Sequence, residues 1–365
     1  MSIQSTHRPG RPHPALSRRA LLAGTAAGAV GLSLAACGKG KKSGSQADSK
    51  TVTVVTHDSF HVSEDLQKAF TSETGYTLKI ATSGDAGALV NKLVLTKDAP
   101  LGDAVFGIDN TYATRALDQG VIDTSATVTL PKGAESYVVA DTPALAPIDV
   151  GDVCLNIDTG YFTGKGLTPP ATFEDLTKPE YKGLLVAINP TNSSPGMAWL
   201  LATIGHFGAG SFAGYWKQLM ANGARIAEDW SAAYETDFSG SGKGTYPIVV
   251  SYASSPSFTV SKDKSSSTTS ALLDTAFRQV EYAGVLKGAA NPEGGKAFVT
   301  WMLSKAVQED IPGQMYMYPV LPDAALPEAL TKFGPLSKSP VKVEPKEITT
   351  HREEWLNTWT EAVGK

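Results

Sequence analysis

The chain has 365 residues, a formal net charge of −4 and two cysteines, Cys37 and Cys154. Its acidic balance argues against nucleic-acid binding, because neutralising phosphates requires clustered Lys and Arg side chains. The histidines follow no metal-ligand spacing and no cysteine pair accompanies them. We therefore expect neither a bound metal nor a cofactor.

The N-terminal segment has the pattern of an export signal. Ser17-Arg18-Arg19 precede a run of 17 small and apolar residues from Ala20 to Ala36, which ends at Cys37. Paired arginines before a short apolar run are typical of a twin-arginine signal, and a small-residue stretch ending in Cys is typical of a lipoprotein signal. We expect residues 1–36 to be a cleaved signal peptide. The alternative is a retained transmembrane anchor, since about 17–25 residues span a bilayer.

Processing at this point would define the mature protein. Cys37 would carry the lipid, and residues 37–50 would form a flexible tether. The mature chain would keep 329 residues, enough for two lobes with separate cores, and a formal charge of −8, because the removed segment holds four arginines and no acid. Cys154 would have no disulfide partner. We expect an extracytoplasmic protein, lipid-anchored to the outer face of the cell membrane.

Strands and helices alternate in the first part of the folded region. The residue pattern predicts, in order, a strand over Thr51–Thr56, a helix over Glu64–Thr74, a strand over Thr77–Ala81, a helix over Ala86–Leu95, and a strand over Ala104–Phe106 before the turn Gly107–Asn110. This order predicts an α/β protein with an open parallel sheet. Its ligand crevice is expected at the carboxyl ends of the strands.

The rest of the chain repeats this order less regularly. We expect strands over Val153–Leu155, Leu184–Ile188 and Ile248–Ser251, and helices over Met197–Phe207, Phe212–Asn222, Gly294–Leu303 and Pro345–Val363. The segment Asp149–Gly151 is predicted to cross between two lobes, with a return near Ser251–Ser257. Lobe 1 would then comprise 51–148 and about 258–320, and lobe 2 would comprise 149–257 and about 321–365. Two crossings predict a cleft that closes on a ligand by hinge motion.

Polar and aromatic segments follow the predicted strands and supply the candidate ligand-binding residues. These are Asp58, Ser59, Asp109, Asn110, Ser193, Ser194, Pro195, Gly196, Trp230, Tyr234, Tyr252, Ser255, Phe258, Tyr316 and Tyr318. Each aromatic face attracts a desolvated cation by roughly 0.5–2 kcal/mol, and a carboxylate such as Asp109 adds charge complementarity. Taken singly, Trp230 or Tyr252 is better explained by core packing, because aromatic residues dominate protein cores. Their shared position at strand ends predicts a site for a flat cationic heterocycle.

The segment Asn189–Gly196 allows two interpretations. Backbone N–H groups at a helix start, beside the hydroxyls of Ser193 and Ser194, would bind an anion such as phosphate. Ordinary N-capping accounts for the same residues.

The same segments, in the same order, resemble those of the thiamine-binding subunit of bacterial ABC importers from about Thr51 to about Val363. The matching motifs are T-x-D-S-F (Thr56–Phe60), G-I-D-N (Gly107–Asn110), S-x-P-G (Ser193–Gly196), W-S-x-A-Y (Trp230–Tyr234), S-Y-x-x-S-P (Ser251–Pro256), M-Y-P-V (Met317–Val320) and R-x-x-W (Arg352–Trp355).

The resemblance implies a two-lobed periplasmic-binding-protein fold that captures thiamine, or one of its phosphate esters, and delivers it to a membrane permease with an ATPase subunit. The protein would act as a monomer. By the same resemblance, Asp109 would pair with the charged or amino-bearing part of the ligand, Trp230 and Tyr252 would line the cleft, and Ser194–Gly196 would face the hydroxyethyl or phosphate end. The family's Tyr and Trp ring sandwich would be made here by Phe258 and Tyr316.

Two alternatives remain open at this stage. A receptor for ferric iron, a polyamine or a phosphonate is the first, with Tyr316 and Tyr318 as the phenolate pair in the iron case. A thiaminase-like enzyme with Cys154 as nucleophile is the second, although a reactive Cys requires a lowered pKa and Cys154 stands in an apolar strand pattern. No phosphate-cradling G-x-x-x-x-G-K motif is present, so ATP hydrolysis would belong to partner subunits. We expect binding without catalysis.

Overall fold

The computed structural model describes residues 50–241 and 243–364. The predicted signal peptide, the lipidation site Cys37 and the tether up to residue 49 lie outside these ranges. The described residues belong to one compact unit. Within them, no helix is both long and apolar enough to cross a membrane.

The strands are β1 (Thr51–Thr56), β2 (Thr77–Thr82), β3 (Ala104–Asp109), β4 (Leu145–Asp158), β5 (Leu185–Ile188), β6 (Arg225–Ala227), β7 (Ile248–Tyr252), β8 (Thr269–Val285) and β9 (Tyr318–Pro319). In the described part of the chain they form one sheet in the order β2-β1-β3-β8-β4-β7-β5-β6, with β9 paired to β4. The expected order of alternating strands and helices is confirmed, but the sheet is mixed and not wholly parallel.

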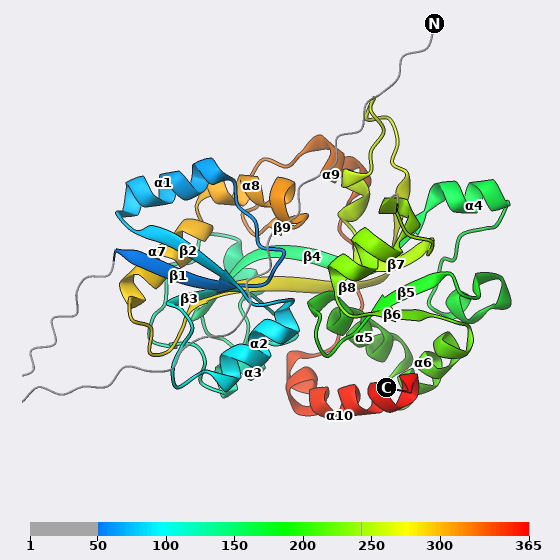
Figure 1. Cartoon of the computed structure of the whole chain (residues 1–365), viewed down its shortest axis with the longest axis horizontal. Helices are drawn as coiled ribbons and strands as arrows, with labels where there is room; N and C mark the ends of the chain where they lie inside the picture. The colour runs from blue at the N-terminus through cyan, green and yellow to red at the C-terminus, as the bar shows by residue number, and fades with distance from the viewer. Residues whose placement is uncertain (1–49, 242, 365) are drawn as a thin grey trace, which may run out of the picture. The chain divides into compact units, whose positions relative to one another are not determined.

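The two ends of the sheet are parallel and its centre is antiparallel. β1 pairs in parallel with β2 and β3, and β5 pairs in parallel with β6 and β7. Between them, β4 and β8 run antiparallel to each other and to their outer neighbours β7 and β3. Figure 1 shows these two long strands running from one group of parallel strands to the other. The first half of the sheet is therefore β1–β3, and the second half is β5–β7.

The chain crosses between the halves along these two strands. The start of β4 pairs with the end of β8 beside β3, whereas Val153–Ile157 of β4 pair with β7. The crossing expected at Asp149–Gly151 thus lies within β4. The return runs along β8, later than the segment Ser251–Ser257 that the sequence pattern suggested, because that segment remains in the second half as the end of β7 and a short 3-10 turn.

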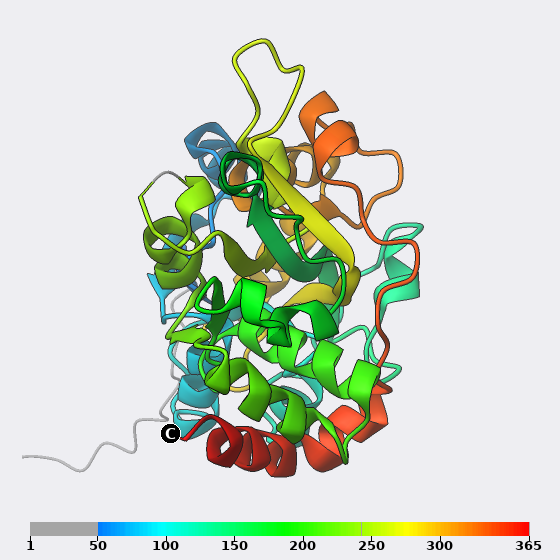
Figure 2. The same cartoon turned by 90° about the vertical axis from the view of Figure 1, so that its right-hand side faces the viewer.

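Helices cover both faces of the sheet. They are α1 (Glu64–Thr74), α2 (Ala86–Leu95), α3 (Ala113–Asp118), α4 (Thr159–Lys165), α5 (Ser194–Phe207), α6 (Phe212–Ala221), α7 (Pro292–Met302), α8 (Lys305–Met315), α9 (Glu328–Phe333) and α10 (Pro345–Val363). In the first half, α1 and α7 lie together on one face and α2 and α3 on the other. In the second half, α5 packs on the sheet, and α10 lies along α6 (Figure 2). The core accordingly extends through both halves.

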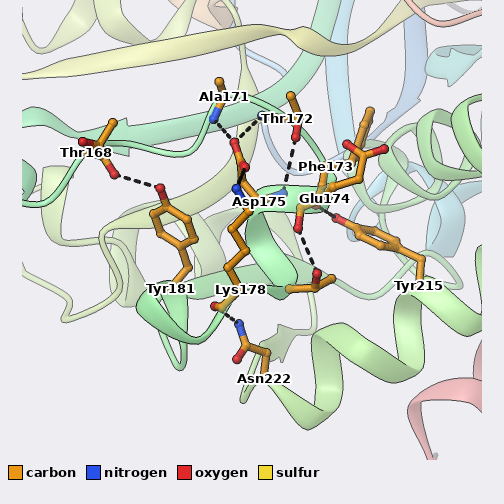
Figure 3. A network of polar contacts seen from close by, with 11 residues as sticks. Thr168, Ala171, Thr172, Phe173, Glu174, Asp175, Lys178, Tyr181, Tyr215 and Asn222 are labelled. Atoms are coloured by element: carbon orange, nitrogen blue, oxygen red, sulfur yellow. Dashed lines mark hydrogen bonds and ion pairs between the residues drawn. The ribbon is translucent and has the colours of Figure 1, made fainter.

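A polar network holds the irregular segment 168–182 against α6 (Figure 3). Asp175 accepts a hydrogen bond from the backbone N–H of Ala171 at 2.8 Å, and the Tyr215 hydroxyl of α6 donates to the carbonyl of Phe173 at 2.9 Å. Side chains therefore satisfy backbone groups that no regular element satisfies. None of these residues belongs to the cavity described next.

Candidate ligand-binding cleft

A cavity lies where the strand ends of the two halves meet. Its lining residues are His57, Ser59, Asp85, Ser194, Pro195, Trp230, Tyr252, Glu281, Met315, Tyr316 and Met317. They come from the ends of β1, β2 and β7, the start of α5, the segment after β6, β8, and the end of α8. The convergence of strand ends is the arrangement that places ligand crevices in α/β proteins. Six of these residues, namely Ser59, Ser194, Pro195, Trp230, Tyr252 and Tyr316, are among those that the sequence predicts.

The free space has an inner and an outer part. The inner cavity holds about 50 Å³, and the adjoining outer cavity holds about 350 Å³. The two share Ser59, Trp230, Met315 and Tyr316, and Asp58 and Glu235 line only the outer part. Pockets for small molecules usually measure about 300–1,000 Å³, so the inner part alone is too small for a two-ring ligand.

Aromatic rings form one continuous cluster in the cleft. The Trp230 ring stacks on Tyr234, with centroids 5.0 Å apart, and lies 6.5 Å from the Tyr252 ring and 6.1 Å from the Tyr316 ring. The Trp230 indole N–H donates to the Ser251 hydroxyl at 2.9 Å, which fixes the orientation of the ring. The structure thus brings the rings of Trp230, Tyr252 and Tyr316 together. Tyr234 stacks on Trp230 but does not line the inner cavity.

Acidic side chains surround the inner cavity. Asp85 and Glu281 line it, while Asp109 and Asp149 are fully buried nearby. Asp149 of β4 lies directly opposite Glu281 of β8 in the strand pair, which brings two carboxyl groups together. Burial, and then the charge of Glu281, raises the pKa of Asp149 well above its usual range. Such a site favours a ligand that brings positive charge.

His57 is the basic side chain of the inner cavity. Its Nδ1 accepts the backbone N–H of Ser59 at 3.1 Å, and its Nε2 lies 3.4 Å from Oε1 of Glu281. Burial is the largest single influence and opposes protonation of the imidazole. The charge and contact of Glu281, together with the charges of Asp85 and Asp58, outweigh it, so the pKa of His57 is raised. His57 therefore offsets part of the negative charge of Glu281.

Asp109 does not line the cavity, but it accepts a hydrogen bond from Ser194, which does. Its carboxylate accepts hydrogen bonds from the N–H of Thr111 at 3.0 Å, from the Thr111 hydroxyl at 2.7 Å and from the Ser194 hydroxyl. Burial raises the pKa of Asp109 to about 6. The direct pairing with a ligand that the sequence resemblance implies is not the position seen here, because β3 points this carboxylate at the start of α5.

The start of α5 is capped by side chains. Ser193 is the N-cap residue, and its hydroxyl accepts the N–H of Gly196. Asp85, itself the N-cap of α2, accepts the N–H of Ser194 at 3.2 Å. Gly196 packs closely against the backbone of Asn189, because a Cβ added at this position would lie only 2.8 Å from the Asn189 carbonyl oxygen. Of the two interpretations of this segment, capping is therefore the one that the hydrogen bonds follow.

Three other predicted residues have supporting or peripheral positions. Asp58 is exposed and lines only the outer cavity. Asn110 bridges β3 to β8 through bonds to the carbonyl of Arg278 and the N–H of Val280. The Ser255 hydroxyl lies 2.9 Å from that of Ser251, below Trp230.

Tyr318 lies away from the cleft. It is on β9, and its hydroxyl donates to the carbonyl oxygens of Gly334 at 2.8 Å and Leu330 at 3.3 Å. Only one of the two tyrosines in this segment, Tyr316, therefore faces the cavity. Among the described residues, no group of three or more His, Cys, Asp or Glu is arranged to hold a metal ion.

Sequence reasoning missed five lining residues, His57, Asp85, Glu281, Met315 and Met317. Asp85 could have been predicted as a site residue, because it lies between β2 and α2, directly after a strand like the other candidate segments. His57 belongs to a segment that the sequence analysis selected. Glu281 lies inside β8, a strand that the residue pattern did not predict, so nothing local marked it.

Cys154 is fully buried in β4, outside the cleft lining. Burial raises the pKa of its thiol far above the usual value. A thiol in this state is a poor nucleophile, since the thiolate is the reactive form.

The family model described as "Bacterial extracellular solute-binding protein" matches residues 103–334, which is more than half of the chain. The chain belongs to this family. The thiamine-binding periplasmic protein of Salmonella typhimurium is 27% identical to it over 326 residues, covering 86% of this chain and 94% of the relative. The protein of the same name from Brucella suis is 27% identical over 329 residues, covering 86% and 92%.

Solved structures agree on the fold. A periplasmic thiamin binding protein superposes with a TM-score of 0.75 at 25% identity, covering 86% of this chain and 96% of the other. An iron-bound binding protein from Pseudomonas aeruginosa gives 0.64 at 20% identity, covering 86% and 99%. The chain thus has the α/β, two-lobed periplasmic-binding-protein fold.

Proposed function

We propose that this solute-binding protein captures thiamine and hands it to the permease and ATPase subunits of an ABC importer. The observation that carries the proposal is the meeting of Trp230, Tyr252 and Tyr316 with the acids Asp85 and Glu281 around one cavity. Electron-rich rings and carboxylates together suit a flat, positively charged heterocycle. The thiamine-binding names of the relatives support the same ligand.

The mechanism is capture and release without bond making. The two halves of the sheet meet at the cleft, and ligand binding would hold them together while β4 and β8 act as the connection. The expected lobe division, 51–148 with about 258–320 and 149–257 with about 321–365, is part of this proposal, except that residues 258–268 go with the second half because the return runs along β8. So are export through the signal at 1–36, lipid anchoring at Cys37 and action as a monomer beside the membrane. Cys154, buried and protonated, takes no part.

A polyamine is the second candidate, and one observation favours it. Four acids, Asp58, Asp85, Glu235 and Glu281, line the two connected cavities. Spaced acids suit a chain of ammonium groups, although such a ligand has no flat ring to stack on the aromatic cluster. The position of Tyr318 removes the phenolate pair on which a ferric-iron site would depend.

Isothermal titration calorimetry with four ligands tests the proposal. We expect saturable one-to-one binding of thiamine, with much weaker heat from spermidine, ferric citrate and methylphosphonate. Binding raises the melting temperature through ligand linkage, so a thermal melt checks the ranking independently. If spermidine binds and thiamine does not, the polyamine assignment replaces this one.

A further inference from the structure

His57 is the basic side chain among the described residues that line the inner cavity, and it is buried, with 7% of its surface exposed. It stands at the unspecified position of the motif over Thr56–Phe60, so the resemblance to the family assigns it no role. We propose that His57 sets how strongly the site attracts positive charge, because its imidazole competes with a bound cation for Glu281. The inference rests on the proposed function, since it requires a cationic ligand.

The fold fixes the position of the imidazole. Its ring lies against Phe106 of β3, with ring centroids 5.4 Å apart. The backbone of Gly107 approaches so closely that a Cβ added there would overlap the His57 ring. The Nδ1 atom also accepts the N–H of Ser59 at 3.1 Å. A charge gained by the ring is therefore gained inside the cavity, because these contacts hold the side chain in place.

The bond from Ser59 identifies the protonation state of the ring. An atom that accepts a hydrogen bond carries no proton, so the single proton of the neutral imidazole lies on Nε2. Nε2 lies 3.4 Å from Oε1 of Glu281 and has no hydrogen-bond partner among the described residues. This separation is longer than a normal N–H···O hydrogen bond. Neutral His57 thus leaves the Glu281 carboxylate able to accept a positive group of a ligand.

A second proton changes both sides of the ring. It must bind Nδ1, where it displaces the N–H of Ser59, a residue that lines both cavities. The resulting imidazolium has its charge within ion-pair distance of Glu281. Opposite charges at such a distance attract more strongly at a buried site than in water. The carboxylate is then neutralised by the protein itself, and a ligand cation gains less from it.

The other titratable groups that face His57 are acids. Burial is the largest influence on the pKa of His57 and lowers it, but Glu281 of β8, Asp85 before α2 and the adjacent Asp58 together raise it above its ordinary value. The β3 residues that touch the ring carry no charge. The ring therefore exchanges its second proton at a pH above 6.5.

Two further acids act on the site without contacting His57. Asp149 of β4 stands opposite Glu281, and Asp109 at the end of β3 accepts the Ser194 hydroxyl. The pKa of each is raised, mainly by burial. Their protons therefore have to be distinguished by experiment from that of His57.

Cation binding and protonation of His57 oppose each other, because both use Glu281. By linkage, a cation bound beside Glu281 lowers the pKa of His57 and releases part of a proton. The affinity for thiamine consequently rises with pH until His57 is neutral in the ligand-free protein. One linked proton changes the affinity by at most about tenfold per pH unit.

Calorimetry of the purified protein with thiamine between pH 6.5 and 8.5 tests this inference, because thiamine does not change its charge in this range. We expect the affinity of the unchanged protein to rise at least about threefold, with proton release seen as a dependence of the binding heat on the ionisation enthalpy of the buffer. His57→Gln keeps a polar amide but cannot take up the proton, so its affinity should change much less with pH. A purely structural role of His57 would instead lower the affinity equally at every pH.

His206→Gln is the matched control, because His206 is exposed and its Nε2 lies 2.7 Å from Glu174, away from the cleft lining. It should keep the full pH dependence, and Asp149→Asn and Asp109→Asn should keep most of it. A pH dependence that persists in His57→Gln and disappears in either Asp variant overturns the inference.

The unchanged protein also separates the inference from the proposed function. Thiamine affinity that does not vary with pH overturns the inference and leaves the proposed function intact. Failure of thiamine to bind at any pH overturns the proposed function, and the inference with it. Should His57→Gln not fold, His57→Asn replaces it, because its amide oxygen can accept the Ser59 N–H in place of Nδ1.

Discussion

The rings of Phe258 and Tyr316 are in contact in a tilted arrangement, with centroids 3.6 Å apart and planes inclined by 33°. They come from segments far apart in the chain, Phe258 from the turn after β7 and Tyr316 from the end of α8, and Phe258 lines neither the inner nor the outer cavity. Tyr316 is the C-cap residue of α8 and has a left-handed backbone, with φ of 63°. The two residues expected to sandwich the ligand are thus in contact with each other, and a flat ligand between them would have to separate them.

Removing one ring of this pair should weaken thiamine binding. We expect Tyr316→Ala to raise the dissociation constant roughly 2- to 30-fold, corresponding to about 0.5–2 kcal/mol for one aromatic face against a cation. Tyr316→Phe keeps the face and should bind nearly as well as the unchanged protein. Calorimetry of both variants checks this. Equal affinities for the Ala and Phe variants would mean that Tyr316 does not touch the ligand.

The raised pKa of Asp109 implies that the stability of the protein depends on pH. Burial raises its pKa from the usual 3.8 to about 6, so the folded state holds this proton more tightly than the unfolded state. The resulting stabilisation is fully present below about pH 4 and is lost as the pH rises through 6. Its size is roughly 2–3 kcal/mol. In urea unfolding between pH 4 and 7.5, the free energy of unfolding should fall less steeply with pH for Asp109→Asn than for the unchanged protein. Parallel curves for the two proteins would contradict the raised pKa of Asp109.

Asp149 should destabilise the ligand-free protein at neutral pH. Its carboxyl group is fully buried and stands opposite Glu281, and burial with that neighbour raises the pKa of Asp149. Stability from this group is present at low pH and is lost as the pH rises. We therefore expect Asp149→Asn to raise the free energy of unfolding by about 1–3 kcal/mol at pH 7.5 and to matter little below pH 4. A variant less stable than the unchanged protein at pH 7.5 would contradict this account.

The Cys154 thiol should be unreactive in the folded protein. Its side chain is fully buried, and the pKa of the thiol is raised by that burial. Incubation with thiamine and a nucleophilic acceptor should leave the thiamine intact, and iodoacetamide should label Cys154 only after unfolding. Steady thiamine loss that disappears in Cys154→Ala would establish an enzyme instead.

Local pattern was sufficient for the first half of the fold. The β-branched run Thr51–Thr56 and the helix Glu64–Thr74 have the predicted bounds, because strand composition and helical periodicity are both strong there. The turn expected at Gly107–Asn110 is largely strand, since Gly107–Asp109 continue β3 with a bulge against β8. The long strand β8 was missed, because its pairing with β3 and β4 joins residues far apart in the chain.

Only part of the candidate site, likewise, could be predicted from the sequence. Tyr252 and Ser194 follow predicted strands, so their convergence could be foreseen from topology, whereas the strand before Trp230, β6, was not predicted. The pairing of Phe258 with Tyr316 came only from family resemblance, because no local rule brings a turn and a helix end together. The redirection of Asp109 to Ser194 is a tertiary contact across the two halves, which spacing along the chain does not reveal.

Tryptophan fluorescence during a thiamine titration tests the central claim most directly. Trp230 lines the cavity, so thiamine should quench the emission saturably and raise the melting temperature of the same sample. Trp230→Phe should abolish most of the quenching, whereas Trp301→Phe, a change in α7 away from the cavity lining, should retain it. Unchanged emission and an unchanged melting temperature at saturating thiamine would contradict the assignment of this cleft to a planar, positively charged ligand.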